Sequence, residues 1–210
     1  MEGRKVELYD LFDIEPGPYA GKLLGRVVPP AYTFTKEVRE LATGSIKGHR
    51  RDIGCFMMSC MEANVARIFM LLGEDVFYEP ELFKLQIRAG HEWEYVGNEA
   101  SYVPDFADSR KIMYEVKGGW KKNRDGMRAM LRICNFLEQY PDRELVLIQN
   151  EDFRGVFPNL KPRFRKIISY KELEKKYREL IDKNPLLCGW EHGTRKNGFN
   201  LSTHPKDFGV

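Results

Sequence analysis

Residues 102–118 read YVPDFADSRKIMYEVKG, and they form the centre of the predicted sheet. Two runs rich in branched and aromatic residues, 102–107 and 111–117, flank a turn-prone Asp-Ser-Arg segment, which predicts two strands joined as a hairpin. If the hairpin turns at that segment, the numbers of paired residues sum to about 220, which places Asp105 opposite Glu115. The stretch therefore predicts two carboxylates side by side on a small sheet.

Successive side chains of a strand point to opposite faces, so Glu115 and Lys117 share one face of the second strand. Like charges that face each other repel, and a site that keeps them generally supplies a cation or raises one pKa. A divalent metal would resolve the conflict, and oxygen ligands favour Mg²⁺ or Mn²⁺ over Zn²⁺. The same alternation is also typical of a half-solvated sheet edge, so a structural role for Glu115 and Lys117 stays open.

The segments around the hairpin predict helices that cover a sheet. Apolar residues at helical spacing predict helices over 59–73, 121–140 and 170–182. Branched and aromatic residues predict one or two short strands over 75–83 and a buried strand over 144–149. The order αβββαβ favours an α/β fold in which a small mixed sheet is flanked by helices.

Apolar spacing also predicts which faces of the first two helices are buried. In the helix over 59–73 the stripe consists of Met61, Val65, Ile68, Phe69 and Leu72. In the helix over 121–140 the stripe consists of Met127, Met130, Leu131, Cys134 and Leu137. We therefore expect both helices to be amphipathic.

At 210 residues the chain is expected to have one core with extensions. Residues 1–50 show no sustained period apart from a short helix predicted over 36–43, and are interpreted as an irregular extension. The core is predicted to span 51–150, with a polar loop over 88–101. Residues 151–210 are expected to form a basic, helical C-terminal extension.

The composition excludes several classes of protein. Hydrophobic residues make up 42% of the chain and charged residues 31%, which excludes a disordered or collagen-like chain. No apolar run approaches the roughly 20 residues of a membrane helix, and residues 1–16 carry acids where a signal peptide is apolar. Four irregularly spaced cysteines fit neither a disulfide framework nor a zinc ribbon. We expect reduced thiols, no membrane partner, and a cytoplasmic protein of a bacterium or a virus-infected host cell.

The basic charge is concentrated in the second part of the chain. Residues 1–120 hold 15 Lys and Arg against 19 Asp and Glu, whereas 121–210 hold 19 against 12. A basic region fits a partner made of phosphates, although such residues also commonly solvate a surface. The phosphate-contact candidates form two groups, Lys121, Arg128 and Arg132 on one helix, and Lys161, Arg163, Arg165 and Lys166 in a later run.

Pro104-Asp105 followed by Glu115-Val116-Lys117 gives the pattern Pro-Asp…Glu-x-Lys, which resembles the PD-(D/E)XK nuclease superfamily. The resemblance extends to Glu62, in a Glu-Ala-Asn run on the helix before the sheet. A Tyr-Glu-Pro run at 78–80 further resembles phage endonucleases and transposon-end endonucleases of this superfamily. The matching segments lie between residues 59 and 119, and their order is more specific than any one of them.

The resemblance implies a restriction-endonuclease-like core and a metal-dependent DNA endonuclease. In that family pattern Asp105, Glu115 and the Val116 carbonyl would bind Mg²⁺ or Mn²⁺, and Glu62 would reach the metal directly or through water. Lys117 would orient or activate the attacking water. For Glu62 an alternative stays open, because Ser59-Cys-Met-Glu62 is also a capping box that would only stabilise the helix start.

Two other functions stay open. The chain could be a non-catalytic nucleic-acid-binding or assembly protein on the same fold, with Glu115 and Lys117 paired structurally. It could also be a transposase-type subunit that cuts DNA only within a larger complex. By analogy with the fold a homodimer is a further possibility, and Trp120 could either stack on DNA or belong to the core.

Overall fold

The structure is a computed structural model that describes residues 24–30, 48–86 and 100–192. The helix predicted over 36–43 lies outside them, as does most of the loop predicted over 88–101. The chain divides into two compact units. Of the described residues, the first unit holds 24–30, 48–78 and 171–192, and the second unit holds the others.

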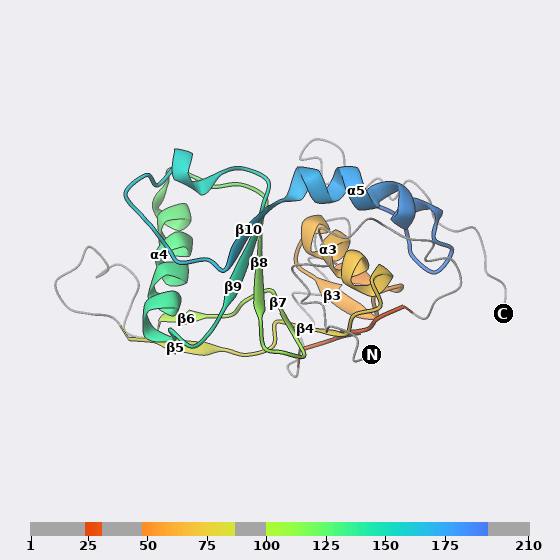
Figure 1. Cartoon of the computed structure of the whole chain (residues 1–210), viewed down its shortest axis with the longest axis horizontal. Helices are drawn as coiled ribbons and strands as arrows, with labels where there is room; N and C mark the ends of the chain where they lie inside the picture. The colour runs from red at the N-terminus through yellow and green to blue at the C-terminus, as the bar shows by residue number, and fades with distance from the viewer. Residues whose placement is uncertain (1–23, 31–47, 87–99, 193–210) are drawn as a thin grey trace, which may run out of the picture. The chain divides into compact units, whose positions relative to one another are not determined.

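The first unit combines two helices with two pairs of short strands (Figure 1). Strand β1 (Val27–Val28) pairs in parallel with β4 (Val76–Tyr78), and β2 (Gly48–Arg50) forms an antiparallel hairpin with β3 (Cys55–Met57). The helices are α3 (Cys60–Leu71) and α5 (Tyr170–Lys183), close to the bounds predicted from the sequence.

The prediction that residues 1–50 are irregular is wrong for their described part, because β1 and β2 lie there. A strand of two or three residues is too short to show an alternation of apolar and polar side chains, so it forms only where a neighbouring segment pairs with it. Gly25 N donates a 2.8 Å hydrogen bond to Met70 O, and a Cβ at Gly25 would lie 2.1 Å from Glu74 O. The absence of a side chain at Gly25 therefore lets this segment pack directly on the backbone after α3.

Helix α3 is not amphipathic, which corrects the expectation from its spacing. Every residue of α3 except Met61 is buried, including the polar Asn64 and Arg67. The Arg67 guanidinium binds the buried Asp52 carboxylate, with 2.6 Å between Nε and Oδ2. Polar residues can occupy the buried face of this helix because distant partners satisfy their hydrogen bonds.

The second unit is built on a mixed sheet in the order β7, β8, β9, β10. Strand β7 (Phe106–Asp108) is antiparallel to β8 (Met113–Lys117), while β8, β9 (Leu145–Gln149) and β10 (Lys166–Ser169) run parallel. The α/β class with a mixed sheet is therefore confirmed. Strand β10 was not predicted, and it lies in the segment that was expected to be a helical extension.

The hairpin register predicted from the sequence is confirmed. Phe106 pairs with Tyr114 and Ala107 with Met113, so both pairs of numbers sum to 220. The first predicted strand, however, is divided in two: β6 (Ala100–Tyr102) pairs with β5 (Phe83–Leu85), and β7 begins only at Phe106. Pro104 lies in the break, where it has no N–H to give to a ladder.

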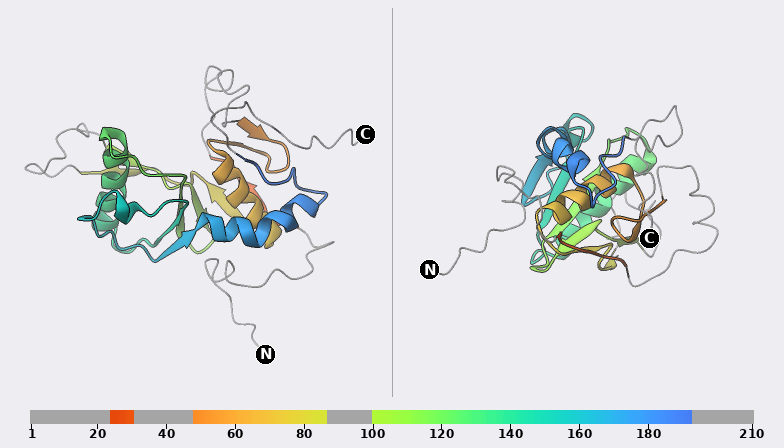
Figure 2. Two further views of the ribbon diagram at one scale, coloured as in Figure 1. Left: turned by 90° about the horizontal axis from the view of Figure 1, so that it is seen from above. Right: turned by 90° about the vertical axis from the view of Figure 1, so that its right-hand side faces the viewer.

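Helix α4 (Arg124–Gln139) covers the core of the second unit and lies beside β5 and β6 (Figure 1; Figure 2). Its buried residues are Met130, Ile133 and Phe136, whereas Met127 is 41% exposed. The predicted apolar face was therefore wrong at Met127 and omitted Ile133 and Phe136. The difference arises because aromatic rings from β5 and β6 extend the covered area, and the Phe136 ring lies 4.8 Å from that of Phe83.

All four cysteines are free thiols, as the sequence predicts. Within the described part of the chain, no helix combines the length and the apolar character that crossing a bilayer requires.

Candidate active site

Asp105 and Glu115 lie side by side at the open end of the β7–β8 hairpin. Continuing the register by one residue beyond β7 places Asp105 opposite Glu115. The Asp105 carboxylate also contacts the second strand directly, because its Oδ2 accepts a 2.6 Å hydrogen bond from Val116 N. The structure therefore brings together the two acids that the sequence places on this hairpin.

The two oxygens of Glu115 have different partners. The Tyr102 hydroxyl donates a 2.6 Å hydrogen bond to Oε2, and the Lys117 ammonium forms an ion pair with Oε1. The Glu115 side chain is 4% exposed and that of Lys117 is 28% exposed. One oxygen is thus bound to a neutral group inside the protein, and the other to a charged group that reaches solvent.

Both acids affect the pKa of the Tyr102 hydroxyl. Burial raises the pKa of its hydroxyl well above the usual value, and the charge of Glu115, its hydrogen bond and the charge of Asp105 raise that pKa further. The hydroxyl therefore stays protonated and remains a donor to Glu115.

Lys117 ends β8 and is held from the neighbouring strand. It pairs in register with Gln149, and its carbonyl accepts a 3.0 Å hydrogen bond from Asn150 N. The Gln149 side chain in turn accepts hydrogen bonds from Trp120 Nε1 at 3.1 Å and from Phe153 N at 3.3 Å. Trp120 is buried with its ring 6.1 Å from that of Phe153, so it belongs to the core and does not offer a stacking surface.

Glu62 belongs to the first unit, where its contacts are local. Its N–H donates to Ser59 Oγ over 3.0 Å, so Ser59 is the N-cap of α3 as the capping-box alternative predicts. Its carboxylate, however, accepts hydrogen bonds from Tyr78 (2.6 Å) and from Met58 N (3.2 Å), one residue before the cap. The acid is buried and hydrogen-bonded within its own unit, and its predicted role as a metal ligand stays a prediction.

The basic residues predicted to contact phosphates all lie in the second unit, together with Asp105, Glu115 and Lys117. Those exposed to solvent are Lys121, Arg132, Lys161 and Arg163, and those partly buried are Arg128, Arg165 and Lys166. Arg165 pairs with Glu144, which neutralises its charge locally. Lys166 is the first residue of β10 and not part of a loop. Four of the seven candidates are therefore exposed to solvent.

A second group of buried charges in the first unit was not predicted. Arg50 Nη2 lies 2.6 Å from Glu191 Oε2, and Arg67 Nη1 lies 2.8 Å from Glu191 Oε1, beside the Arg67–Asp52 pair. Asn64 Nδ2 also donates to Glu191 O over 2.8 Å. This group connects α3 and the β2–β3 hairpin with residues after α5, and its paired charges indicate a structural role.

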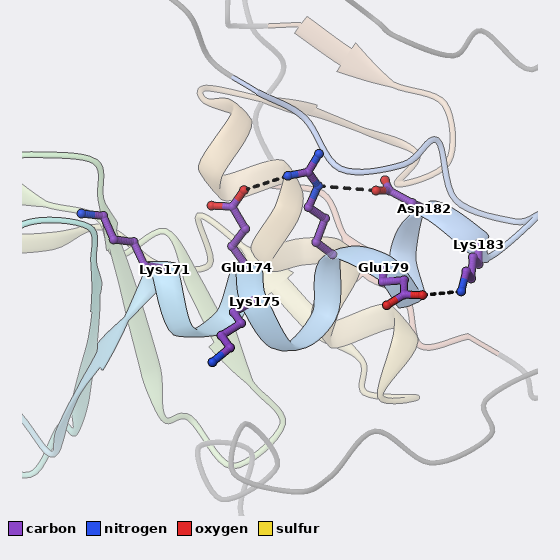
Figure 3. A pocket seen from close by; sticks show the side chains of 7 residues that line it. Lys171, Glu174, Lys175, Glu179, Asp182 and Lys183 are labelled. Carbon is purple, nitrogen blue, oxygen red and sulfur yellow. Dashed lines mark hydrogen bonds and ion pairs between the residues drawn. The ribbon is translucent and has the colours of Figure 1, made fainter.

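A surface hollow of about 520 Å³ follows α5 in the first unit (Figure 3). Its lining consists of charged side chains, several of them paired: Arg178 lies 3.7 Å from Glu174 and 3.6 Å from Asp182, and Lys183 pairs with Glu179. Residues Asp105, Glu115 and Lys117 do not line it. The hollow is therefore a charged helix surface and not the cavity of the candidate site.

Among residues 24–30, 48–86 and 100–192, no three His, Cys, Asp or Glu side chains form a ready-made metal site. The oxygen donors of Asp105 and Glu115 are of the kind that Mg²⁺ or Mn²⁺ binds, and they occur here as a pair. A cation that used Glu115 Oε1 would have to displace the Lys117 ammonium from it.

The sequence reasoning did not identify Tyr102 as part of the site. A signal was available, because a buried carboxylate needs a donor and Tyr102 ends the strand that leads to Asp105.

No protein-family model, curated protein or solved structure matches this chain.

Proposed function

We propose that the chain is a metal-dependent DNA endonuclease with a restriction-endonuclease-like core and a site formed by Asp105, Glu115 and Lys117. The observation that supports the proposal is the 2.6 Å hydrogen bond from Val116 N to Asp105 Oδ2, which holds the Asp105 carboxylate beside the strand segment that carries Glu115. The lysine pairs with Glu115 from the same strand face. Two acids and an amine grouped at the end of a strand pair are the groups that metal-assisted phosphodiester hydrolysis needs.

Mg²⁺ or Mn²⁺ at Asp105 and Glu115, with the Val116 carbonyl as a further predicted ligand, would supply a nucleophilic water near neutral pH and compensate charge on the phosphate. The chain's own groups have separate tasks. Asp105 and Glu115 provide the negative charge that holds a cation. The Lys117 ammonium, which reaches solvent, binds a phosphate oxygen or orients the attacking water.

DNA would approach the second unit over its basic residues. Lys121, Arg132, Lys161 and Arg163 are exposed in the same unit as the site. Each exposed Lys or Arg that neutralises a phosphate adds a salt-dependent contribution to binding and no sequence preference. We propose DNA as the substrate on this basis, and a homodimer or a larger DNA-processing complex in the cytoplasm as the working form.

The test is Mg²⁺-dependent cleavage of plasmid and branched DNA by the full chain. Asp105→Ala and Lys117→Ala should each reduce the cleavage rate by at least about a hundredfold. Asp142→Ala and Lys84→Ala are the matched controls, because both residues are exposed in the same unit and should leave the rate unchanged. Full activity of both site variants would reject the proposed site.

One observation favours a second candidate, a non-catalytic nucleic-acid-binding protein or a transposase-type subunit. The Lys117 ammonium pairs with Glu115 and could serve as its permanent partner. A nuclease should gain thermal stability with Mg²⁺, Mn²⁺ or Ca²⁺, because a ligand that prefers the native state stabilises it. Neither a shift nor cleavage would favour the binding protein, and cleavage restored by partner proteins would favour the subunit.

A further inference from the structure

We infer that Tyr102 is a positioning residue of the proposed site: its hydroxyl holds Glu115 Oε2 inside the protein and leaves Oε1 as the oxygen for a cation. The inference rests on the proposed function, because it concerns how Glu115 meets a metal. It adds a residue that the family pattern of the sequence did not supply.

The Tyr102 ring is fixed from two sides. Tyr102 ends β6 and pairs with Phe83 of β5, and its ring lies 4.7 Å from that of Phe136 on α4. The residue is 5% exposed. A ring held by a strand and a helix cannot follow a moving carboxylate, so its hydroxyl is a fixed point to which the carboxylate must orient.

The two partners of Glu115 differ in charge, so one can stay bound when a cation arrives and the other must leave. The hydroxyl is neutral, so it can hold Oε2 without repelling a cation at the other oxygen. The Lys117 ammonium carries a positive charge and competes with a cation for Oε1. Lys117 is also the partner with access to solvent, so it is the one that can move.

Two consequences follow for the site. Glu115 binds a cation through one oxygen only, because the other remains with Tyr102. The cation also releases the Lys117 ammonium from Glu115, which makes it available to a phosphate or to water. Tyr102 thus acts through Glu115 and need not touch the substrate.

The experiment compares two Tyr→Phe variants of the full chain. Tyr102→Phe removes the hydroxyl that binds Glu115, and Tyr140→Phe removes one that donates to Lys84 O over 2.9 Å. Both rings pack against Phe136, so the variants make the same chemical change in one aromatic cluster. Unfolding temperature without metal shows whether each variant is folded, and Mn²⁺ binding is measured by calorimetry, with Glu115→Gln as the reference for loss of the carboxylate.

Tyr102→Phe should weaken Mn²⁺ binding about ten- to a hundredfold, which is the usual effect of removing a group that orients a metal ligand. It should also raise the Mn²⁺ concentration needed for cleavage more than it lowers kcat, and Tyr140→Phe should change neither. Equal Mn²⁺ affinity in Tyr102→Phe and wild type, with Glu115→Gln weakened, overturns the inference alone. A folded wild type that binds no Mn²⁺ overturns the proposed function and this inference with it.

A measurement on the unmutated chain decides the matter if Tyr102→Phe does not fold. The Tyr102 hydroxyl proton in a short bond to a carboxylate should give a downfield NMR signal that Glu115→Gln shifts or removes. The signal should persist when Mg²⁺ saturates the site, because Oε2 keeps its donor. Its loss on Mg²⁺ binding would mean that the cation takes both oxygens, which overturns the inference.

Discussion

The carboxylate of Asp105 accepts a 2.6 Å hydrogen bond from the backbone N–H of Val116, the residue between Glu115 and Lys117. Asp105 lies just before β7 begins, so its side chain makes a link between the two strands at a point where the β7 ladder has not yet started. The acid proposed to hold a cation therefore also stabilises the hairpin that carries the other site residues.

This double role separates two substitutions of Asp105. Asp105→Ala should lower the free energy of unfolding by about 1.5–3 kcal/mol, because the hydrogen bond has a charged acceptor. Asp105→Asn keeps an oxygen that can accept from Val116 N and should lose less stability. Both should lose cleavage. Urea unfolding of the three proteins tests this, and an Asp105→Ala variant as stable as wild type would show that the bond does not support the hairpin.

Removing Arg67 should destabilise the first unit strongly. Its guanidinium pairs with both Asp52 and Glu191, and all three side chains are buried. Arg67→Met would leave two buried carboxylates short of a partner, which typically costs about 3–5 kcal/mol.

The matched control for Arg67→Met is Arg26→Ala, because the Arg26 side chain pairs with Asp75 but is 81% exposed. That substitution should leave the urea midpoint almost unchanged, since exposed pairs contribute little. Equal effects of the two substitutions would show that burial does not set the strength of the Arg67 pair.

The same buried group predicts loss of stability in acid. Burial opposes ionisation of Glu191, but its hydrogen bonds and ion pairs with Arg50 and Arg67 outweigh this and hold its pKa below the usual 4.5. Burial also opposes ionisation of Asp52, and the contacts with Arg67 and Cys188 N again lower its pKa below 3.8. The unfolded chain therefore takes up protons first as the pH falls.

The stabilisation from these two acids should be complete above pH 4.5 and should decrease as the pH falls further, through their lowered folded-state pKa values. Urea unfolding of wild type and of Glu191→Gln between pH 7 and pH 3 measures it. The variant should lose less stability on acidification than wild type. Parallel pH profiles would contradict an ionised Glu191 in the folded state.

Alanine should destabilise the second unit at one of its glycines and have almost no effect at another. A Cβ at Gly126 in α4 would lie 2.1 Å from Lys121 O, so Gly126→Ala should destabilise the unit by about 1–3 kcal/mol despite the higher helix propensity of alanine. At Gly155 a Cβ would meet nothing within 4 Å. Gly155→Ala should therefore leave the unfolding temperature nearly unchanged, and a stable Gly126→Ala would show that the segment before α4 can move away.

Much of the second unit could be predicted because its signals are local. Strands β8 and β9 and helix α4 follow from short runs of apolar residues, and the turn composition at 108–110 set a hairpin register that the structure confirms. Asp105, Glu115 and Lys117 lie within one hairpin, so a prediction of that hairpin already brings them together. Local sequence was sufficient for this part because the contacting residues are close along the chain.

The α/β class, the positions of the main helices and strands, and the register of the hairpin that carries Asp105, Glu115 and Lys117 all follow from the sequence. The burial of the polar face of α3, in contrast, depends on the tertiary structure, since one of the two carboxylates that pair with Arg67 belongs to Glu191, more than a hundred residues away. The tertiary structure also decided that Tyr102 binds Glu115, because the break at Pro104 assigns β6 to a different partner from β7. The spacing of apolar residues shows which side chains share one face of a helix or strand. The residues that pack on that face can come from distant parts of the chain, so the local sequence does not reveal them.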